Sequence, residues 1–157
     1  MCRLRPVSHR GKCSGAEPPP RARPYADRAA NSTHGGNLGG LNILLVEDHP
    51  DTAQALKRYL EFCGHSVVRA GTCEEALRHP DLARIEVLIC DIGLPDCSGW
   101  ELLPELRAKT GPAYAVAITA RGLPGDAARS LASGFQAHLT KPFAPTKLVE
   151  LLTGRRG

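Results

Sequence analysis

Hydrophobic and polar positions follow a repeating pattern from residue 41 onward, in which short apolar runs alternate with segments of mixed polarity. The apolar runs at residues 41–46, 87–90 and 114–118, together with the more polar segments 66–69 and 136–139, predict five strands. The run at residues 87–90 is apolar throughout. Such a run is typical of a central strand that is buried on both faces of a parallel sheet.

The segments between these runs carry apolar residues at helical spacing. They predict five helices, at residues 50–63, 73–79, 99–109, 124–133 and 145–152. In the first helix Leu56, Leu60 and Cys63 form one apolar face, and Gly64 is a suitable end. Five alternations of strand and helix require right-handed crossovers. They therefore predict an α/β fold, a five-stranded parallel sheet that is doubly wound, with helices on both faces.

Local signals refine the second and third helices. Residues 72–75 (Thr-Cys-Glu-Glu) match a capping box and predict a helix through about His79. Ser98 is a suitable cap for the third helix, which contains Pro104. A proline in a helix interior costs about 3 kcal/mol, so we expect a kink or a late helix start at this position.

The first forty residues differ from this pattern because they are rich in proline, arginine and glycine and have almost no apolar periodicity. They hold seven Lys/Arg and two acids, a net charge of +5, whereas residues 41–157 hold thirteen and fourteen, a net charge of −1. We therefore expect residues 1–40 to be a disordered tail or linker, residues 41–153 to form one domain and residues 154–157 to be a flexible end. The near-neutral domain offers no basic stripe, so we expect no direct DNA binding.

No stretch approaches the roughly 18 apolar residues of a membrane span, so we expect a soluble protein with no membrane contact. The six cysteines contain no Cys-x-x-Cys pair and no zinc-type spacing. Cys63 and Cys90 lie in apolar contexts and are predicted core residues. Cys97 is expected to be an exposed thiol near the candidate site, with nothing nearby to activate it for redox control. The cysteine usage favours a reducing cytosol and a cytoplasmic location.

Polar side chains stand where the predicted strands end. Glu47 and Asp48 follow the first strand, Asp91 the third, Thr119 the fourth and Lys141 the fifth. Because the carboxyl ends of parallel strands share one edge of a sheet, these side chains should meet in one pocket. Each also has a structural interpretation: the acids as turn or helix caps, Thr119 as a packing residue and Lys141 as a solvated lysine.

Three crowded carboxylates repel one another unless a cation neutralises them. Oxygen ligands without His or thiolate favour Mg²⁺, with Mn²⁺ as a possible substitute. A nucleophilic carboxylate, a metal ion, an ammonium group and a hydroxyl group suit phosphoryl transfer. The residues therefore predict a phosphoryl-transfer site.

Residues 41 to about 153 resemble the response regulator receiver domain of two-component signalling. The motifs are residues 43–48 (Ile-Leu-Leu-Val-Glu-Asp), Asp91 with Leu94, Pro95 and Gly99, then Thr119-Ala120 and Lys141-Pro142-Phe143. The resemblance implies a flavodoxin-like sheet of receiver type, with strand order 2-1-3-4-5. It also implies a phosphoacceptor that dephosphorylates itself slowly and is not an enzyme acting on other substrates.

The resemblance further implies the roles of individual residues. Asp91 would accept the phosphoryl group, and Asp91, Asp48 and the Gly93 carbonyl would ligate Mg²⁺, with Glu47 acting directly or through water. Thr119 and Lys141 would hold phosphoryl oxygens. Three further residues would flank the phosphoryl group: Ala120, which leaves room for it, Arg121, and Pro142 after a cis peptide bond.

Two positions depart from, or vary within, the family pattern. His138 stands where the family has a Tyr or Phe that switches together with Thr119, so it is either the switch residue or a half-buried strand residue. Gly93 and Arg121 occupy the variable positions that flank the phosphoryl group. We expect Gly93 to leave water access open and Arg121 partly to screen it.

The resemblance implies a histidine kinase or a histidine phosphotransfer protein as phosphodonor and an unidentified downstream protein as target. It also admits a phosphorylation-dependent dimer. The amino-acid sequences of residues 46–52 and 134–142 are similar to those of receivers in hybrid histidine kinases. No output domain is expected after the fifth helix. Two alternatives remain open: an Asp-nucleophile phosphatase, which would need an acid at the position of Gly93, and an interaction module that is not phosphorylated.

Overall fold

The structure of the protein is a computed structural model that describes residues 39–155. The predicted tail over residues 1–40 therefore lies almost wholly outside the described residues, as do Cys2 and Cys13. Residues 156 and 157 also lie outside them. The remainder of the predicted domain is described.

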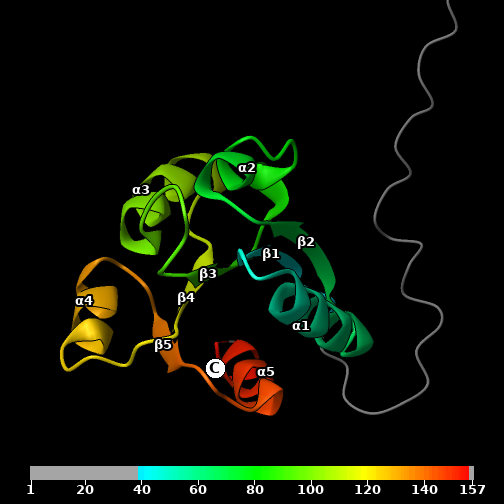
Figure 1. Ribbon diagram of the computed structural model, residues 1–157. Helices are drawn as coiled ribbons and strands as arrows, with labels where there is room; N and C mark the ends of the chain where they lie inside the picture. Colours follow the sequence, from blue (N-terminus) through cyan, green and yellow to red (C-terminus); the bar gives the residue numbers. More distant parts are fainter. Residues whose placement is uncertain (1–38, 156–157) are drawn as a thin grey trace, which may run out of the picture. The chain divides into compact units, whose positions relative to one another are not determined.

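Five strands form one parallel sheet with the order β2-β1-β3-β4-β5 (Figure 1). Their bounds are β1 Asn42–Val46, β2 Ser66–Ala70, β3 Val87–Asp91, β4 Tyr114–Thr119 and β5 Ala137–Thr140. The parallel pairing and the order 2-1-3-4-5 confirm the predicted fold class. In the register of this sheet Val46 pairs with Cys90, and Asp91 with Ile118, so the ends of neighbouring strands are level.

Helices follow the strands. Their bounds are α1 Pro50–Phe62, α2 Cys73–Leu77, the 3-10 helix η2 Leu82–Arg84, α3 Gly99–Thr110, α4 Asp126–Ala132 and α5 Pro145–Gly154. α1 and α5 lie on one side of the sheet, α2 and α3 lie on the other, and α4 lies beside β5 (Figure 1). Within residues 39–155, none of these helices combines the length and the apolar composition that crossing a bilayer requires.

The core consists of two layers, one on each face of the sheet, because successive strand residues point to opposite faces. Ile43 and Leu45 of β1 pack in one cluster with residues of α1 and α5. Leu44 and Val46 pack in the other cluster with residues of α2 and α3. All five residues of β3 are buried, as predicted for the central strand.

Helix ends differ from the sequence-based expectations where local bonds compete. Thr72 accepts a hydrogen bond from the Glu75 amide, but the Glu75 carboxylate accepts from the Gly71 amide at 2.6 Å instead of closing a capping box on Thr72. At its other end, α2 stops at Leu77, not at His79. α4 begins at Asp126, not at residue 124, because Gly125 before it has a positive φ of 98°.

The expected late start of α3 is wrong. Ser98 and Glu101 form a complete capping box, and this box begins the helix at Gly99. The helix then continues through Pro104 to Thr110.

The cysteine predictions hold only in part. Cys97 is not an exposed free thiol, because it forms a disulfide with Cys73 across 24 residues of sequence. Cys63 is half-buried because it lies after the last residue of α1, whereas Cys90 is buried as predicted. The spacing of the cysteines in the sequence did not indicate a disulfide between the loop after β3 and the start of α2.

Replacing Gly99 with alanine is expected to lower the free energy of unfolding by about 1–3 kcal/mol, the usual cost of overpacking. A Cβ atom at this position would lie 2.7 Å from the Asp91 carbonyl oxygen and 3.0 Å from the Cys90 sulfur. Urea denaturation of the variant and the wild type measures the loss. The control is Gly154→Ala at the end of α5, where a Cβ meets nothing within 4 Å, and its change should stay within about 0.5 kcal/mol.

Candidate functional site

The carboxyl ends of four strands meet at one edge of the sheet and carry the predicted polar residues. Glu47 and Asp48 follow β1, Asp91 and Thr119 end β3 and β4, and Lys141 follows β5. Asp91, Thr119 and Lys141 line one pocket of about 650 Å³ together with Gly93, Ala120 and Arg121. Residues from distant parts of the chain therefore share a single open cavity.

Lys141 joins two of these strand ends. Its ammonium group lies 2.7 Å from Asp91 Oδ2 and 2.5 Å from Glu47 Oε2. Both carboxylates are buried, with exposed fractions of 5% for Asp91 and 0% for Glu47. Partial burial lowers the pKa of Lys141, but hydrogen bonds and charge interactions with the two acids outweigh this effect, so that the pKa is raised above its ordinary value. The lysine is therefore held in its charged form.

The second oxygen of each buried acid is also bonded. Asp91 Oδ1 accepts a hydrogen bond from the Gly93 amide at 2.8 Å. Glu47 Oε1 accepts one from the His49 amide at 3.2 Å and lies 3.3 Å from His49 Nδ1. These bonds fix the orientation of both carboxylates without any added ligand.

His49 is a member of the site that sequence reasoning missed. Its Nδ1 lies 3.0 Å from Asp48 Oδ1, and one ligand atom each from Glu47, Asp48 and His49 lies within 4.8 Å of the others. Asp91 is not a member of this group. The signal in the sequence was the position of His49 directly after the acid pair at the end of a strand.

The donor set fits a divalent cation. Glu47 and Asp48 supply carboxylate oxygens, the ligands that Mg²⁺ and Mn²⁺ prefer, and His49 adds a nitrogen that Mn²⁺ accepts more readily than Mg²⁺. Asp48 is partly exposed, so an ion can approach from solvent. The cluster thus offers a solvent-accessible position with two acids to hold a cation.

Thr119 and its neighbours form the opposite side of the pocket. The Thr119 hydroxyl donates to the Arg121 carbonyl oxygen at 3.0 Å and accepts from the Arg121 amide at 3.2 Å. Ala120 and Arg121 are exposed. The hydroxyl therefore caps its own loop, and its proton must leave the Arg121 carbonyl before it can bond to another oxygen.

The peptide bond between Lys141 and Pro142 is cis, as expected, and Pro142 is exposed. Gly93 is also exposed, and a Cβ placed on it would lie 3.6 Å from Asp91 Oδ1. A side chain at this position would consequently stand directly over the carboxylate. With glycine there, that approach stays open.

His138 belongs to a hydrogen-bonded chain that the sequence did not reveal. Its Nδ1 lies 2.9 Å from Ser130 Oγ, and Ser130 Oγ accepts a hydrogen bond from Trp100 Nε1 at 3.0 Å. The guanidinium of Arg129 lies 3.7 Å above the Trp100 ring. Because the indole N–H only donates, the Ser130 proton is available for His138 Nδ1. α3, α4 and β5 are thereby connected through one buried hydroxyl.

Replacing Ser130 with alanine is expected to destabilise the protein by about 1–3 kcal/mol, because the half-buried groups of Trp100 and His138 lose their shared partner. Urea denaturation measures the change. Ala128→Ser, at an exposed position of the same helix, is the matched control and should have little effect. Equal stabilities of Ser130→Ala and the wild type would mean that the hydroxyl contributes nothing to the packing of α4.

Comparison with known proteins gives consistent results. A family model described as the response regulator receiver domain matches residues 43–153. An uncharacterised 14.6 kDa protein from the sodA1 3′ region of Leptolyngbya boryana is 35% identical over 117 residues, which are 73% of this chain and 89% of that protein. The transcriptional regulatory protein TrcR of Mycobacterium tuberculosis is 33% identical over 121 residues, which are 77% of this chain and 47% of TrcR.

The chain spans about half the length of the M. tuberculosis regulators that it matches. Among solved structures, a CheY-like receiver domain protein from Methanospirillum hungatei matches with a TM-score of 0.66 and 28% identity, covering 74% of this chain and 93% of that one. CheY4 of Vibrio cholerae matches with a TM-score of 0.67 and 26% identity, covering 73% of this chain and 98% of that one. The protein therefore belongs to the response regulator receiver domain family of two-component signalling.

Proposed function

We propose that this receiver takes a phosphoryl group from a phosphohistidine onto Asp91, and that the resulting acyl phosphate changes its contacts with other proteins. The observation that carries the proposal is the buried Asp91 carboxylate, which faces an open pocket while Lys141 and the Gly93 amide hold its two oxygens. Because Asp91 already lines this pocket, its carboxylate can reach a phosphorus atom there without a rearrangement of the backbone.

In the proposed reaction an Asp91 carboxylate oxygen forms a bond to phosphorus as the bond between phosphorus and the donor imidazole nitrogen breaks. The imidazole keeps the electron pair of the broken bond. Lys141 lies beside the attacking carboxylate and neutralises negative charge on the incoming phosphoryl oxygens. The Thr119 hydroxyl turns from the Arg121 carbonyl to one of these oxygens, and Ala120 leaves room for them.

Charge balance supports a divalent cation in the same site. Glu47, Asp48 and Asp91 carry three negative charges, and Lys141 supplies one positive charge against them. Mg²⁺, or Mn²⁺ in its place, would be held by Asp48, Asp91 and the Gly93 carbonyl, with Glu47 acting directly or through water. When bound, the cation neutralises and orients the phosphoryl oxygens.

The partners follow from the same chemistry. We propose a histidine kinase or a histidine phosphotransfer protein as donor, and a downstream protein as target that recognises the phosphorylated form, including a second copy of the receiver. Thr119 and His138 would be the switch residues. Thr119 ends β4, and β4 pairs with β5, which carries His138, so a change in the hydrogen bonds of the Thr119 hydroxyl can change the position of the His138 side chain. A cytoplasmic location, and a place within a hybrid histidine kinase, belong to this proposal.

Incubation of the protein with acetyl phosphate and Mg²⁺ tests the function. Uptake of about one phosphoryl group per chain, located on Asp91 by mass spectrometry, is the expected result. Many turnovers of released phosphate per chain without accumulation of labelled Asp91 would favour the Asp-nucleophile phosphatase. Absence of labelling, with a folded protein, would favour an interaction module that is not phosphorylated.

Replacing Arg121 with alanine is expected to shorten the half-life of the acyl phosphate, by about threefold if the side chain partly excludes the attacking water. Arg121 is exposed and lines the Asp91 pocket, while Gly93 leaves the other approach open. The decay of the labelled protein after removal of donor measures the half-life. Arg84→Ala, outside the pocket, is the control. An unchanged half-life in Arg121→Ala would dismiss the screening role.

A further inference from the structure

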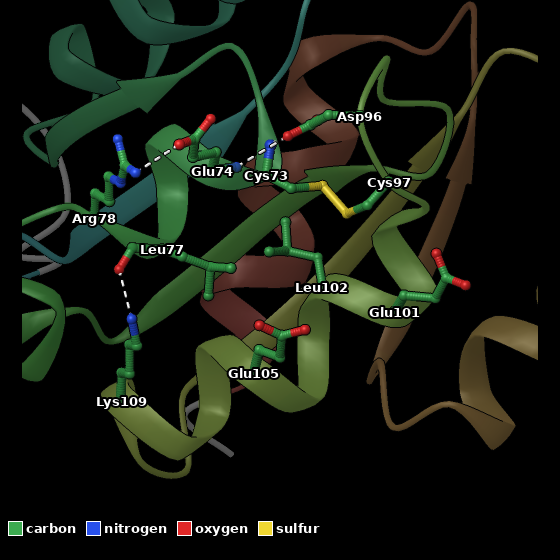
Figure 2. Close-up of a pocket in the computed structure, with 10 residues that line it drawn as sticks. All are labelled: Cys73, Glu74, Leu77, Arg78, Asp96, Cys97, Glu101, Leu102, Glu105 and Lys109. Carbon is green, nitrogen blue, oxygen red and sulfur yellow. Dashed lines mark hydrogen bonds and ion pairs between the residues drawn. A yellow bond between two sulfur atoms is a disulfide. The ribbon is translucent and has the colours of Figure 1, made fainter.

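The loop that follows the phosphoacceptor is attached to α2 by two kinds of bond. Cys97 of this loop forms a disulfide with Cys73, the first residue of α2 (Figure 2). The neighbouring Asp96 carboxylate accepts hydrogen bonds from the Cys73 amide at 2.9 Å and the Glu74 amide at 3.0 Å. The hydrogen bond from the Cys73 amide, and after it the one from the Glu74 amide, lower the pKa of Asp96 below its ordinary value. The carboxylate therefore stays charged and bonded.

The same loop is closed at its other end around Asp91. Gly93 and Ser98 form an isolated antiparallel β-bridge, and the Gly99 amide donates a hydrogen bond to the Ile92 carbonyl at 3.0 Å. The Gly93 amide donates in turn to Asp91 Oδ1. Residues 93–98 therefore form one short ring that holds the disulfide on one side and contacts the phosphoacceptor on the other.

Small molecules can reach the disulfide from an adjacent pocket. Cys73 is buried and Cys97 is half-buried, and both border an open pocket of about 700 Å³ between α2 and α3 (Figure 2). The far end of α2 is held independently, since Lys109 of α3 donates to the Leu77 carbonyl at 2.8 Å. Cleavage of the disulfide should therefore leave the loop held to α2 only by the Asp96 hydrogen bonds, while the far end of the helix stays attached to α3.

We propose that Cys73 and Cys97 are a reversible thiol–disulfide pair, whose oxidation state sets how firmly the loop holds the cation site beside Asp91. For its effect on phosphorylation this inference rests on the proposed function. In the reduction step the thiolate of a dithiol attacks Cys97 Sγ, the sulfur–sulfur bond breaks, and Cys73 leaves with the electron pair and takes up a proton. The second thiol of the reductant then displaces Cys97, and the dithiol ends as a cyclic disulfide.

The other described cysteines serve as internal controls. Burial, followed by the charges of Asp91 and Glu47, raises the pKa of the Cys90 thiol far above its ordinary value, so that it stays protonated and unreactive. Cys63 is free and half-buried after α1, and it lines neither pocket. Cys63→Ser is consequently a matched variant that removes a thiol but not the pair.

The chemistry is tested with the full chain, equilibrated in mixtures of reduced and oxidised dithiothreitol and alkylated before peptide mapping by mass spectrometry. We expect Cys73 and Cys97 to become alkylated together as the mixture becomes more reducing, while Cys63 is alkylated throughout. Alkylation of either cysteine of the pair in oxidising buffer, or of neither in reducing buffer, would overturn the proposal. Peptide mapping identifies each thiol separately, including Cys2 and Cys13.

The coupling is tested by titrating Mg²⁺ against the fluorescence of Trp100, the single tryptophan of the chain, which lines the Asp91 pocket. We expect affinity to fall about tenfold on reduction, as for loss of a group that supports a metal ligand. Cys97→Ser should behave as the reduced wild type in either buffer, and Cys63→Ser as the wild type in both. Equal Mg²⁺ affinities of oxidised and reduced wild type would overturn the coupling.

Labelling with acetyl phosphate separates this inference from the proposed function. If neither redox form is labelled while Mg²⁺ affinity still depends on the disulfide, the proposed function fails and the redox coupling stands. If both forms are labelled at equal rates with equal Mg²⁺ affinity, the proposed function stands and the redox coupling fails.

Discussion

Asp91→Asn is expected to reduce labelling by acetyl phosphate from about one phosphoryl group per chain to background, because an amide cannot form the acyl phosphate. Asparagine has nearly the same shape as aspartate, and its oxygen can still accept the hydrogen bond that the Gly93 amide gives to Asp91 Oδ1 at 2.8 Å. The fold should therefore survive the substitution. Mass spectrometry of the intact protein, before and after treatment, measures the loss.

The matched control is Asp81→Asn, which removes an exposed carboxylate outside the pocket and should be labelled as the wild type is. Circular dichroism of both variants checks that they are folded. Full labelling of Asp91→Asn would place the phosphoryl group on another residue and would remove the basis for the proposed function.

Lys141→Ala is expected to lower the free energy of unfolding by about 3 kcal/mol in the absence of divalent cations, because the buried carboxylates of Glu47 and Asp91 lose their shared positive partner. Addition of Mg²⁺ should recover part of the loss, since a cation bound only by the folded state stabilises it. Urea denaturation with EDTA and with excess Mg²⁺ measures both effects.

Lys147→Ala is the control for loss of a lysine charge. Lys147 forms an exposed ion pair with Glu150 on α5, a type of contact that contributes less than about 1 kcal/mol. Its removal should have little effect with or without Mg²⁺. A loss in Lys141→Ala no larger than in Lys147→Ala would show that Lys141 does not balance the two buried acids.

Features that depend on short stretches of sequence could be predicted. Each strand was signalled by the sequence of its own segment, and the residue after that segment had to lie at the carboxyl edge of the sheet. That reasoning was sufficient to bring Asp91, Thr119 and Lys141 into one pocket. It did not reveal that Lys141 pairs with Glu47 as well as Asp91, because the choice of partner depends on how side chains from β1, β3 and β5 converge.

Features that depend on the path of a loop could not be predicted. The Cys73–Cys97 disulfide requires the segment after β3 to fold against the start of α2, and no periodicity records that path. Ser130 looked like an ordinary residue of an alanine-rich helix, and only its burial between Trp100 and His138 gives it a role. His49 stands beside predicted ligands and directly before the first predicted helix, and sequence reasoning assigned it no role in the site.

The close contact at Gly99 also has a mechanical consequence. With no side chain to separate them, the first turn of α3 rests directly on the backbone at the end of β3. α3 has 12 residues and is therefore about 18 Å long. A tilt of about 5° at Gly99 would move its far end by about 1.5 Å. A small displacement of the backbone at Asp91 would therefore be enlarged at the far end of α3, near Thr110.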